Sequence, residues 1–217
     1  MPAEIIEIEC PSCGCEFEVP MREFVDAQED PTVKKKIIEG EFFLNACPDC
    51  GDQMLVEYPV MYTDPEKKLN VYLAPGHEED LLDQMNSLDI PPVDDTADVV
   101  YRVVGNGVSL MEKILLAENG RDDRVMELYK FTVWDQVQDE WPDLEPGDLL
   151  YMYDEDGEYL VIWTSDNGED EMLSIELDEE LYQELAKNYL QHMEVPATHY
   201  AEVDQYWIRQ RFERGEE

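Results

Sequence analysis

Short alternations of apolar and polar residues dominate the first third of the chain. Residues 4–9 alternate isoleucine with glutamate, and residues 16–19 repeat the alternation with phenylalanine and valine. A period of two predicts half-buried strands. A further strand is expected at 53–62, with Pro59 at an edge position or bulge, and a hairpin partner for it at 69–73. The first third therefore predicts several short antiparallel strands.

Helical patterns are brief in this part of the chain and longer after it. One or two helical turns are expected at 21–28, and a short helix at 34–40 that Gly40 closes. A strand rich in β-branched residues is expected at 99–104. A helix should follow with Ser109 as its N-cap, and Asp122 should open the next helix.

The last third combines strands, acidic turns and helices. The expected elements are strands at 149–153, 159–163 and 172–177 and helices at 178–193 and 198–214. Asp156-Gly157 marks a hairpin turn, and Asp178 is expected to cap the helix after the third strand. The fold class is therefore α+β: an N-terminal ribbon of short antiparallel strands, helices, and a C-terminal antiparallel three-stranded meander with two helices.

Proline and acidic residues suggest where the chain divides. The expected parts are the ribbon at 1–75, an acidic linker at 76–98, a helical part at 99–141 and an acidic α+β extension at 142–217. The linker contains Pro91-Pro92, and a brief helix is expected within it at 80–88.

Charge narrows the classes of partner. The 217 residues include 54 acids and 15 bases, a net charge of -39 at pH 7. Residues 131–186 contain 19 acids and no lysine or arginine. Such a field repels phosphate backbones and attracts cationic proteins, which makes a basic protein partner the expectation and nucleic acid an unfavoured one. Adaptation to a salty cytoplasm would produce the same acidity, and this alternative stays open.

The distribution of apolar and charged residues also indicates the cellular compartment. The chain contains no run of about 18 apolar residues, so no membrane span is expected. Its N-terminal residues are acidic and lack the basic start of a signal peptide. A cytoplasmic location is expected, where thiols stay reduced.

Two matching cysteine turns carry the clearest chemistry. Cys10-Pro11-Ser12-Cys13-Gly14 and Cys47-Pro48-Asp49-Cys50-Gly51 each place two thiols at C-x-x-C spacing, followed by glycine. Two facing turns of this kind supply four thiolates in a tetrahedron, the donor set that zinc prefers. We expect one structural zinc ion on Cys10, Cys13, Cys47 and Cys50.

These turns and several later segments resemble the CpXC family, which is bacterial and archaeal. The resemblance rests on both cysteine turns and on the four segments 40–45, 62–64, 74–76 and 122–130. It covers about residues 5–130. It implies a four-cysteine metal site on the same cysteines and brings no particular activity with it.

The remaining thiol and a cluster of lysines allow two alternative functions. Cys15 is a fifth thiol, and together with the paired cysteines it allows a redox regulator or enzyme as an alternative function. Lys34, Lys35 and Lys36 form the basic cluster between the two turns, which allows nucleic-acid binding as a third function. The histidines His77, His192 and His199 are expected to be ordinary surface residues.

The late acidic segment has two further interpretations. The loops at 154–158 and 166–170 do not match the calcium-loop pattern and are expected to be solvated turns. Tyr151, Tyr153, Tyr159 and Trp163 share odd numbers, so within each strand they lie on one face and offer aromatic surface to a cationic partner. No catalytic constellation is recognised, and the expected function is a non-enzymatic interaction or adaptor module.

Overall fold

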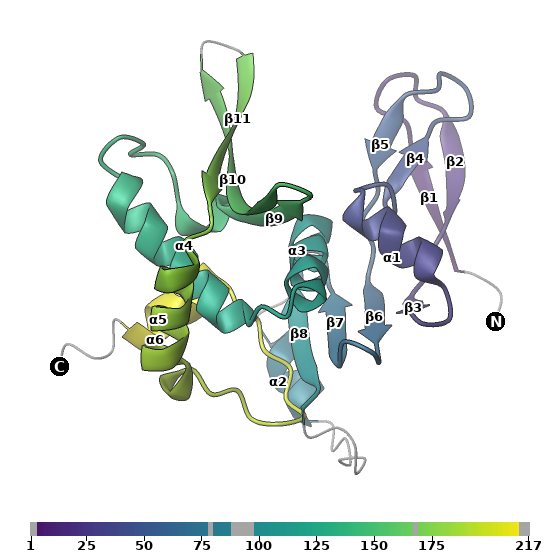
Figure 1. Ribbon diagram of the computed structural model, residues 1–217. Helices are drawn as coiled ribbons and strands as arrows, with labels where there is room; N and C mark the ends of the chain where they lie inside the picture. The colour runs from purple at the N-terminus through teal and green to yellow at the C-terminus, as the bar shows by residue number, and fades with distance from the viewer. Residues whose placement is uncertain (1–3, 78–79, 88–97, 167–168, 213–217) are drawn as a thin grey trace. The chain divides into compact units, whose positions relative to one another are not determined.

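The computed structural model describes residues 4–77, 80–87, 98–166 and 169–212 of the chain (Figure 1). Helices and small sheets alternate along the sequence, and this confirms the α+β class. The chain divides into two compact units. Unit 1 comprises residues 1–111 and 197–200, and unit 2 comprises residues 112–196 and 201–217. The expected division into four parts stays a prediction, and residues 78–79 and 88–97 of the expected linker lie outside the described residues.

Two small antiparallel hairpins carry the cysteine turns in unit 1. The first pairs β1 (Ile5–Glu9) with β2 (Glu16–Pro20), and the second pairs β4 (Leu44–Ala46) with β5 (Gln53–Leu55). Figure 1 draws the two hairpins side by side. The strands expected on either side of the first turn are confirmed, whereas β4 before the second turn was not predicted.

A four-stranded sheet in the order β3-β6-β7-β8 forms the rest of unit 1. Its strands are β3 (Phe24–Asp26), β6 (Val60–Asp64), β7 (Leu69–Leu73) and β8 (Val100–Val104). β6 and β7 are antiparallel, whereas β3 and β8 pair with their neighbours in parallel. The expected hairpin of β6 and β7 is confirmed. The single strand expected at 53–62 is instead two strands, β5 and β6, in two different sheets on either side of Pro59.

The helical turns expected at 21–28 were a wrong prediction. The segment contributes β3, and Val25 at its centre is fully buried. Val25 pairs with Tyr62 of β6, so pairing with a strand far along the chain outweighs the weak local preference for helix. The next prediction is confirmed, because α1 (Pro31–Ile38) is helical and Gly40 follows it with a φ of 72°.

One segment of the expected linker packs against the sheet of unit 1. The helix α2 (Leu81–Ser87) places Leu81, Leu82 and Met85 against a cluster that includes Tyr101 of β8. Tyr200, from the short C-terminal piece of unit 1, belongs to the same cluster, and its ring centroid lies 5.2 Å from that of Tyr101.

Two helices follow the sheet. They are α3 (Gly107–Glu118) and α4 (Asp123–Val137). The cap of α4 is confirmed, because the Asp122 side chain accepts the backbone N–H of Arg124. The cap expected for α3 was wrong: Asn106, three residues earlier, accepts the Ser109 N–H, and Ser109 lies inside the helix. Serine and asparagine are comparable caps, and the sequence did not distinguish them.

Unit 2 contains the expected meander. Its strands β9 (Leu150–Asp154), β10 (Gly157–Asp166) and β11 (Glu169–Glu176) lie in the order β11-β10-β9. The register pairs Tyr151 with Leu160 and Tyr159 with Met152. Tyr151 and Tyr153 therefore lie on the opposite face of the sheet from Tyr159 and Trp163. The aromatic surface expected from these four residues is divided between two faces.

The C-terminal helices are shorter than the sequence pattern suggests. Asp178 caps α5 (Glu179–Tyr189) as expected, and a short 3-10 turn, η2 (Leu190–His192), follows. The last helix, α6 (Gln205–Phe212), begins later than the expected residue 198, because residues 197–200 belong to unit 1 and Tyr200 hydrogen-bonds Asn86 there. Among the described helices, none has the length and apolar run that crossing a bilayer requires.

Candidate functional site

The first cysteine turn is a tight loop closed by backbone hydrogen bonds. The N–H of Gly14 donates to the carbonyl of Cys10 at 2.8 Å, and the N–H of Cys10 donates to the carbonyl of Cys15 at 2.9 Å. Gly14 has a φ of 73°, in the left-handed region where a side chain is strained. The loop thus turns the chain back so that β2 can pair with β1.

The second turn repeats the first bond for bond. Gly51 donates to the Cys47 carbonyl at 2.9 Å, and Cys47 donates to the Asp52 carbonyl at 2.8 Å. Gly51 has a φ of 79°. In each hairpin, the last strand residue before the turn pairs with a residue seven positions later, Glu9 with Glu16 and Ala46 with Gln53. The two turns are therefore equivalent structures, and we call them the knuckles.

The knuckles bring their four sulfurs together. The Sγ atoms of Cys10 and Cys50 lie 3.6 Å apart, and those of Cys13 and Cys47 also lie 3.6 Å apart. All four Sγ atoms lie within 4.8 Å of one another. A zinc–sulfur bond of about 2.3 Å gives sulfur–sulfur edges of about 3.8 Å in a tetrahedron. The donor set and its spacing therefore fit a metal ion of this type.

Each knuckle contributes one inner and one outer thiol. Cys10 and Cys47 are buried, whereas Cys13 and Cys50 are exposed. Backbone N–H groups two or three residues beyond a cysteine point at its sulfur: the N–H groups of Cys50 and then Asp49 lower the pKa of Cys47 to about 6 against the cost of its lost hydration. Donors of this kind stabilise thiolates and thereby support metal binding.

The fifth thiol and the basic cluster have ordinary local partners. Cys15 is half-buried, its thiol donates to the Glu16 carbonyl at 3.6 Å, and loss of hydration raises its pKa. Lys34 forms a 2.8 Å ion pair with the buried carboxylate of Asp64. Lys35 lies 3.5 Å from Glu39, one helical turn along α1. Two of the three clustered lysines are therefore paired with acids of this chain.

The histidines and the acidic turn do not combine into a site in the described part of the chain. The Nδ1 atoms of His77 and His199 lie 3.0 and 3.1 Å from backbone carbonyls three and two residues earlier. His192 is exposed in η2. The Asp154 carboxylate accepts the Asp156 N–H and the Tyr159 hydroxyl, both at 2.8 Å, so it closes the hairpin turn. The second acidic loop lies partly outside the described residues.

Sequence reasoning missed a row of like charges beside the first knuckle. The register places Glu7 opposite Glu18 and Glu9 opposite Glu16, so four carboxylates share one face of the β1–β2 hairpin. We call these four residues the glutamate ladder. Carboxylates directly opposite each other destabilise a strand pair. The stability of the β1–β2 hairpin therefore depends on its knuckle more than that of a hairpin without opposed like charges would.

Sequence reasoning also missed a group of buried charges in unit 2, which we call the ionic network. Its members lie on α3 and α4 and are nearly inaccessible to water. They are Glu112, Lys113, Asp123, Glu127 and Lys130. The Lys130 ammonium lies 2.7 Å from Glu112 and 3.2 Å from Glu127. The Lys113 ammonium lies 3.1 Å from Asp123 and 3.5 Å from Glu127.

Backbone groups from later segments complete the ionic network. Glu112 accepts the Tyr151 N–H at 2.6 Å, and Lys113 donates to the Val203 carbonyl at 2.7 Å. With three acids and two bases, the network carries one excess carboxylate. Burial raises the pKa of Glu127, although both lysines oppose that shift.

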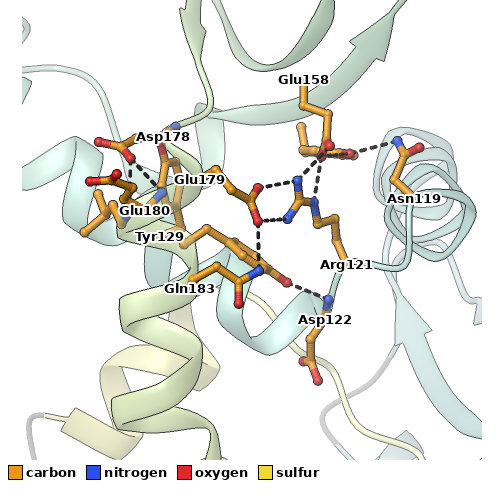
Figure 2. A network of polar contacts seen from close by, with 12 residues as sticks. Asn119, Arg121, Asp122, Tyr129, Glu158, Asp178, Glu179, Glu180 and Gln183 are labelled. Carbon is orange, nitrogen blue, oxygen red and sulfur yellow. Dashed lines mark hydrogen bonds and ion pairs between the residues drawn. The ribbon is translucent and has the colours of Figure 1, made fainter.

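A second polar cluster joins α3 and α4 to the rest of unit 2 (Figure 2). Arg121 donates two hydrogen bonds to Glu158 of β10, both at 2.7 Å, and two to Glu179 at the start of α5, at 2.6 and 3.2 Å. Its guanidinium lies 4.7 Å from the centre of the Tyr182 ring. A forked pair of this kind fixes orientation as well as distance.

A faint sequence signal for the ionic network exists. Asp123, Glu127 and Lys130 fall at i, i+4 and i+7 and therefore on one face of α4. A charged face of a helix ordinarily faces water, and the periodicity gave no sign that α3 would cover it. The partners at Tyr151 and Val203 are distant in sequence, and no local pattern points to them.

Comparison with known proteins adds one match. A family model described as "CpXC protein" matches residues 8–130, which include both knuckles, α3 and the first half of α4 with all residues of the ionic network. No curated protein and no solved structure matches the chain.

Proposed function

The chain belongs to the CpXC family, and from this premise we propose that it is a zinc-stabilised interaction module that binds a cationic protein. In this proposal, Cys10, Cys13, Cys47 and Cys50 hold one structural zinc ion, and the acidic surface of unit 2 binds the partner. The acidity of residues 131–186, which is exposed at nearly every acid whose exposure the structure describes, is the observation that carries the proposed interaction. We place the module in the cytoplasm, where its thiols stay available to metal.

Zinc is proposed because of the donors. Four thiolates at tetrahedral spacing favour zinc over the oxygen-preferring cations, and four protein ligands leave no coordination position open for substrate. Such a site stabilises a fold. When bound, the ion supplies cross-links between the two hairpins, while the backbone N–H groups around Cys47 stabilise the thiolate charge.

The interaction is proposed because the acids of unit 2 face water. In residues 131–186, every acidic side chain whose exposure the structure describes is exposed, except Glu158. Within the described part of the chain, ion pairs engage only Glu145, Glu158 and Glu179 of these acids. Many carboxylates are thus available to a partner, and they would accelerate its association at low salt.

Metal analysis of the purified chain tests the zinc proposal. One zinc per chain is expected, with four thiols protected from a thiol reagent until a chelator is added. Cys15→Ser should keep the full metal content. A chain purified without metal that neither binds added zinc nor protects its thiols would contradict the proposal.

A charge-matched pair of variants tests the cationic partner. Glu155, Asp156, Glu180 and Glu184 are exposed acids of unit 2, and the glutamate ladder supplies four exposed acids of unit 1. Each set is replaced by the neutral amides, and binding of a lysine- and arginine-rich peptide is measured by calorimetry at several salt concentrations. Only the unit 2 variant should bind more weakly. Equal weakening by both variants would show that net charge, rather than a site, attracts the peptide.

The alternative functions have weaker support. Nucleic-acid binding through Lys34, Lys35 and Lys36 is disfavoured because Lys34 is paired with Asp64 and the net charge is -39. Thiol redox chemistry that uses Cys15 and the knuckle cysteines would need thiols that metal does not occupy. The thiol protection experiment separates that function from the structural one.

A further inference from the structure

One face of the unit 2 sheet is apolar at its centre although the sequence around it is acidic. The register aligns three rows of residues across this face. The rows are Met152, Tyr159 and Glu176; Leu150, Val161 and Ser174; and Trp163 with Met172. We call these residues the outer face. Its central Val161 is buried, but Trp163, Met172, Ser174 and Glu176 are exposed, whereas Tyr151, Leu160 and Ile162 on the opposite face are all buried.

The last row of the outer face is the most exposed. Trp163 is 65% exposed and Met172, directly opposite it, is 57% exposed. β9 pairs with β10 only as far as Val161, so this row has two strands where the others have three. A large aromatic ring and a thioether facing water side by side are unusual on a surface and typical of a binding site.

Carboxylates lie at the other end of the same face. Glu176 is exposed and pairs across the strands with Tyr159. Asp154 is exposed as well and accepts the Tyr159 hydroxyl at 2.8 Å. Trp163 lies four positions after Tyr159 along β10, so the two ends of the face lie about 13 Å apart.

We propose that the outer face binds an extended segment of a partner protein that carries arginine or lysine at positions i and i+4. One cation stacks on the Trp163 ring with its aliphatic stem against Met172, and the other pairs with Glu176 and Asp154. An extended segment spans about 13 Å in four residues, which matches the separation of the two anchors. Tryptophan is the best ring for a cation–π contact.

The charge around the outer face favours a cationic peptide over an anionic ligand or a second copy of this chain. Residues 131–186 contain 19 acids and no lysine or arginine, which disfavours an anionic ligand such as a nucleic acid or an acidic lipid surface there. A second copy of this chain carries a net charge of -39 and would add to the repulsion. The arginines at 121, 209 and 211 already stack on Tyr182, Phe131 and Trp207. A cationic side chain from a different protein is therefore the occupant that the charge of the outer face favours.

The inference rests on the proposed function, because it assigns a specific face to the cationic partner. The probe is a fluorescein-labelled peptide, Ser-Arg-Thr-Val-Thr-Arg-Ser, and the control peptide has the same composition with the two arginines adjacent. Binding to the zinc-loaded full chain is measured by fluorescence anisotropy. Trp163→Ala should weaken binding of the probe about two- to tenfold. Trp163→Phe, which keeps a ring, should weaken it less.

The controls separate this inference from the broader function. Tyr206→Ala removes an equally exposed ring of unit 2 and should leave binding unchanged. The adjacent-arginine peptide should bind more weakly than the probe. If Trp163→Ala leaves probe binding unchanged, or if both peptides bind alike, the outer face is not the binding site. Salt-dependent binding of a cationic partner elsewhere on the acidic surface of unit 2 would not be contradicted by that result. If neither peptide binds the unaltered chain at low salt, both the inference and the proposed interaction are overturned.

Discussion

The knuckles and the ionic network both gather chemically demanding groups into a small space, and they do so from different kinds of sequence. The knuckles place four thiols within 4.8 Å through two copies of one local turn. The ionic network places five charges in the interior of unit 2 through two adjacent helices and two backbone groups from distant segments. The first is defined by local sequence, and the second by tertiary packing.

The comparison shows how each arrangement compensates for burying polar groups. A bound metal ion would neutralise the thiolates, and the stability of the knuckles would then depend on the supply of metal. The ionic network compensates its own charges except for one carboxylate, so its stability depends on pH and on each partner staying in place. Four predictions test this contrast.

The largest effect is expected from Cys47→Ser, which removes a buried thiol from the knuckles. The variant should lose its metal and most protection of the β1, β2, β4 and β5 amides, because small structural zinc sites contribute about 10–16 kcal/mol to folding. Metal content and hydrogen exchange measure the two effects. Cys15→Ser is the matched control and should resemble the unaltered chain. Wild-type amide protection in metal-free Cys47→Ser would show that the hairpins stand without the ion.

The next largest effect is expected from Lys130→Met in the ionic network. Removing the cation leaves Glu112 and Glu127 buried without it, and this should lower the free energy of unfolding by about 3–5 kcal/mol. Urea denaturation measures the loss. Lys187→Met removes an exposed lysine from α5 and should change stability little. Equal effects of the two variants would mean that the network contributes no more than a surface charge.

A smaller, pH-dependent effect is expected from Glu127→Gln. The pKa of Glu127 in the folded chain is raised above its value of 4.5 in the unfolded chain. The folded state therefore binds the extra proton more tightly, and stability falls as pH rises from about 4.5 through the raised pKa, by at most about 1.4 kcal/mol per pH unit. Glutamine carries no titrating proton and should remove this part of the dependence.

The measurement for Glu127→Gln is the difference in unfolding free energy between the variant and the unaltered zinc-loaded chain, taken at several pH values. Contributions from other groups cancel in that difference. The variant should gain relative stability as pH rises. A difference that stays constant with pH would show that Glu127 titrates normally in the folded chain.

The smallest effect is expected in the glutamate ladder. Glu7→Lys converts the pair with Glu18 from repulsive to attractive and should stabilise the first hairpin by about 0.2–1 kcal/mol. Glu4→Lys makes the same change in net charge outside the β1–β2 register and is the control. Thermal unfolding of the zinc-loaded variants compares the two. Stabilisation of the same size by both would assign the effect to net charge.

The parts of the fold that follow from local sequence were predictable. The alternations around the knuckles, the turn glycines and the Asp122 and Asp178 caps all act through neighbours in the chain. The parts that depend on distant residues were not. β3 is a strand because β6 lies beside it, and α6 starts late because Tyr200 belongs to the cluster around Tyr101.

The candidate sites show the same division. The four cysteines of the knuckles were singled out by their spacing, because each pair lies within one turn, and the structure brings their sulfurs together. The ionic network was missed because helical periodicity places its α4 residues on a charged face and says nothing of what covers it. The alternation within each strand predicted which aromatic residues share a face of that strand. The register between β9 and β10 cannot be read from either strand alone, and it places Tyr151 and Tyr153 on the opposite face of the sheet from Tyr159 and Trp163.

The pairing of sulfurs across the knuckles has a consequence for the topology of the chain. Cys13 meets a partner 34 positions away and Cys10 a partner 40 positions away, so a bound ion would close the intervening segment into a ring. In the simplest polymer treatment, closing a loop of this length lowers the unfolded chain's entropy by the equivalent of about 4 kcal/mol at 25 °C. The ring contains β3 and α1, and it would hold β3 near the start of β6 before their parallel pairing forms. Metal uptake would thus lower the entropy cost of the parallel β3–β6 pairing, a kind of pairing that forms slowly. The folding rate of unit 1 would then depend on the zinc concentration.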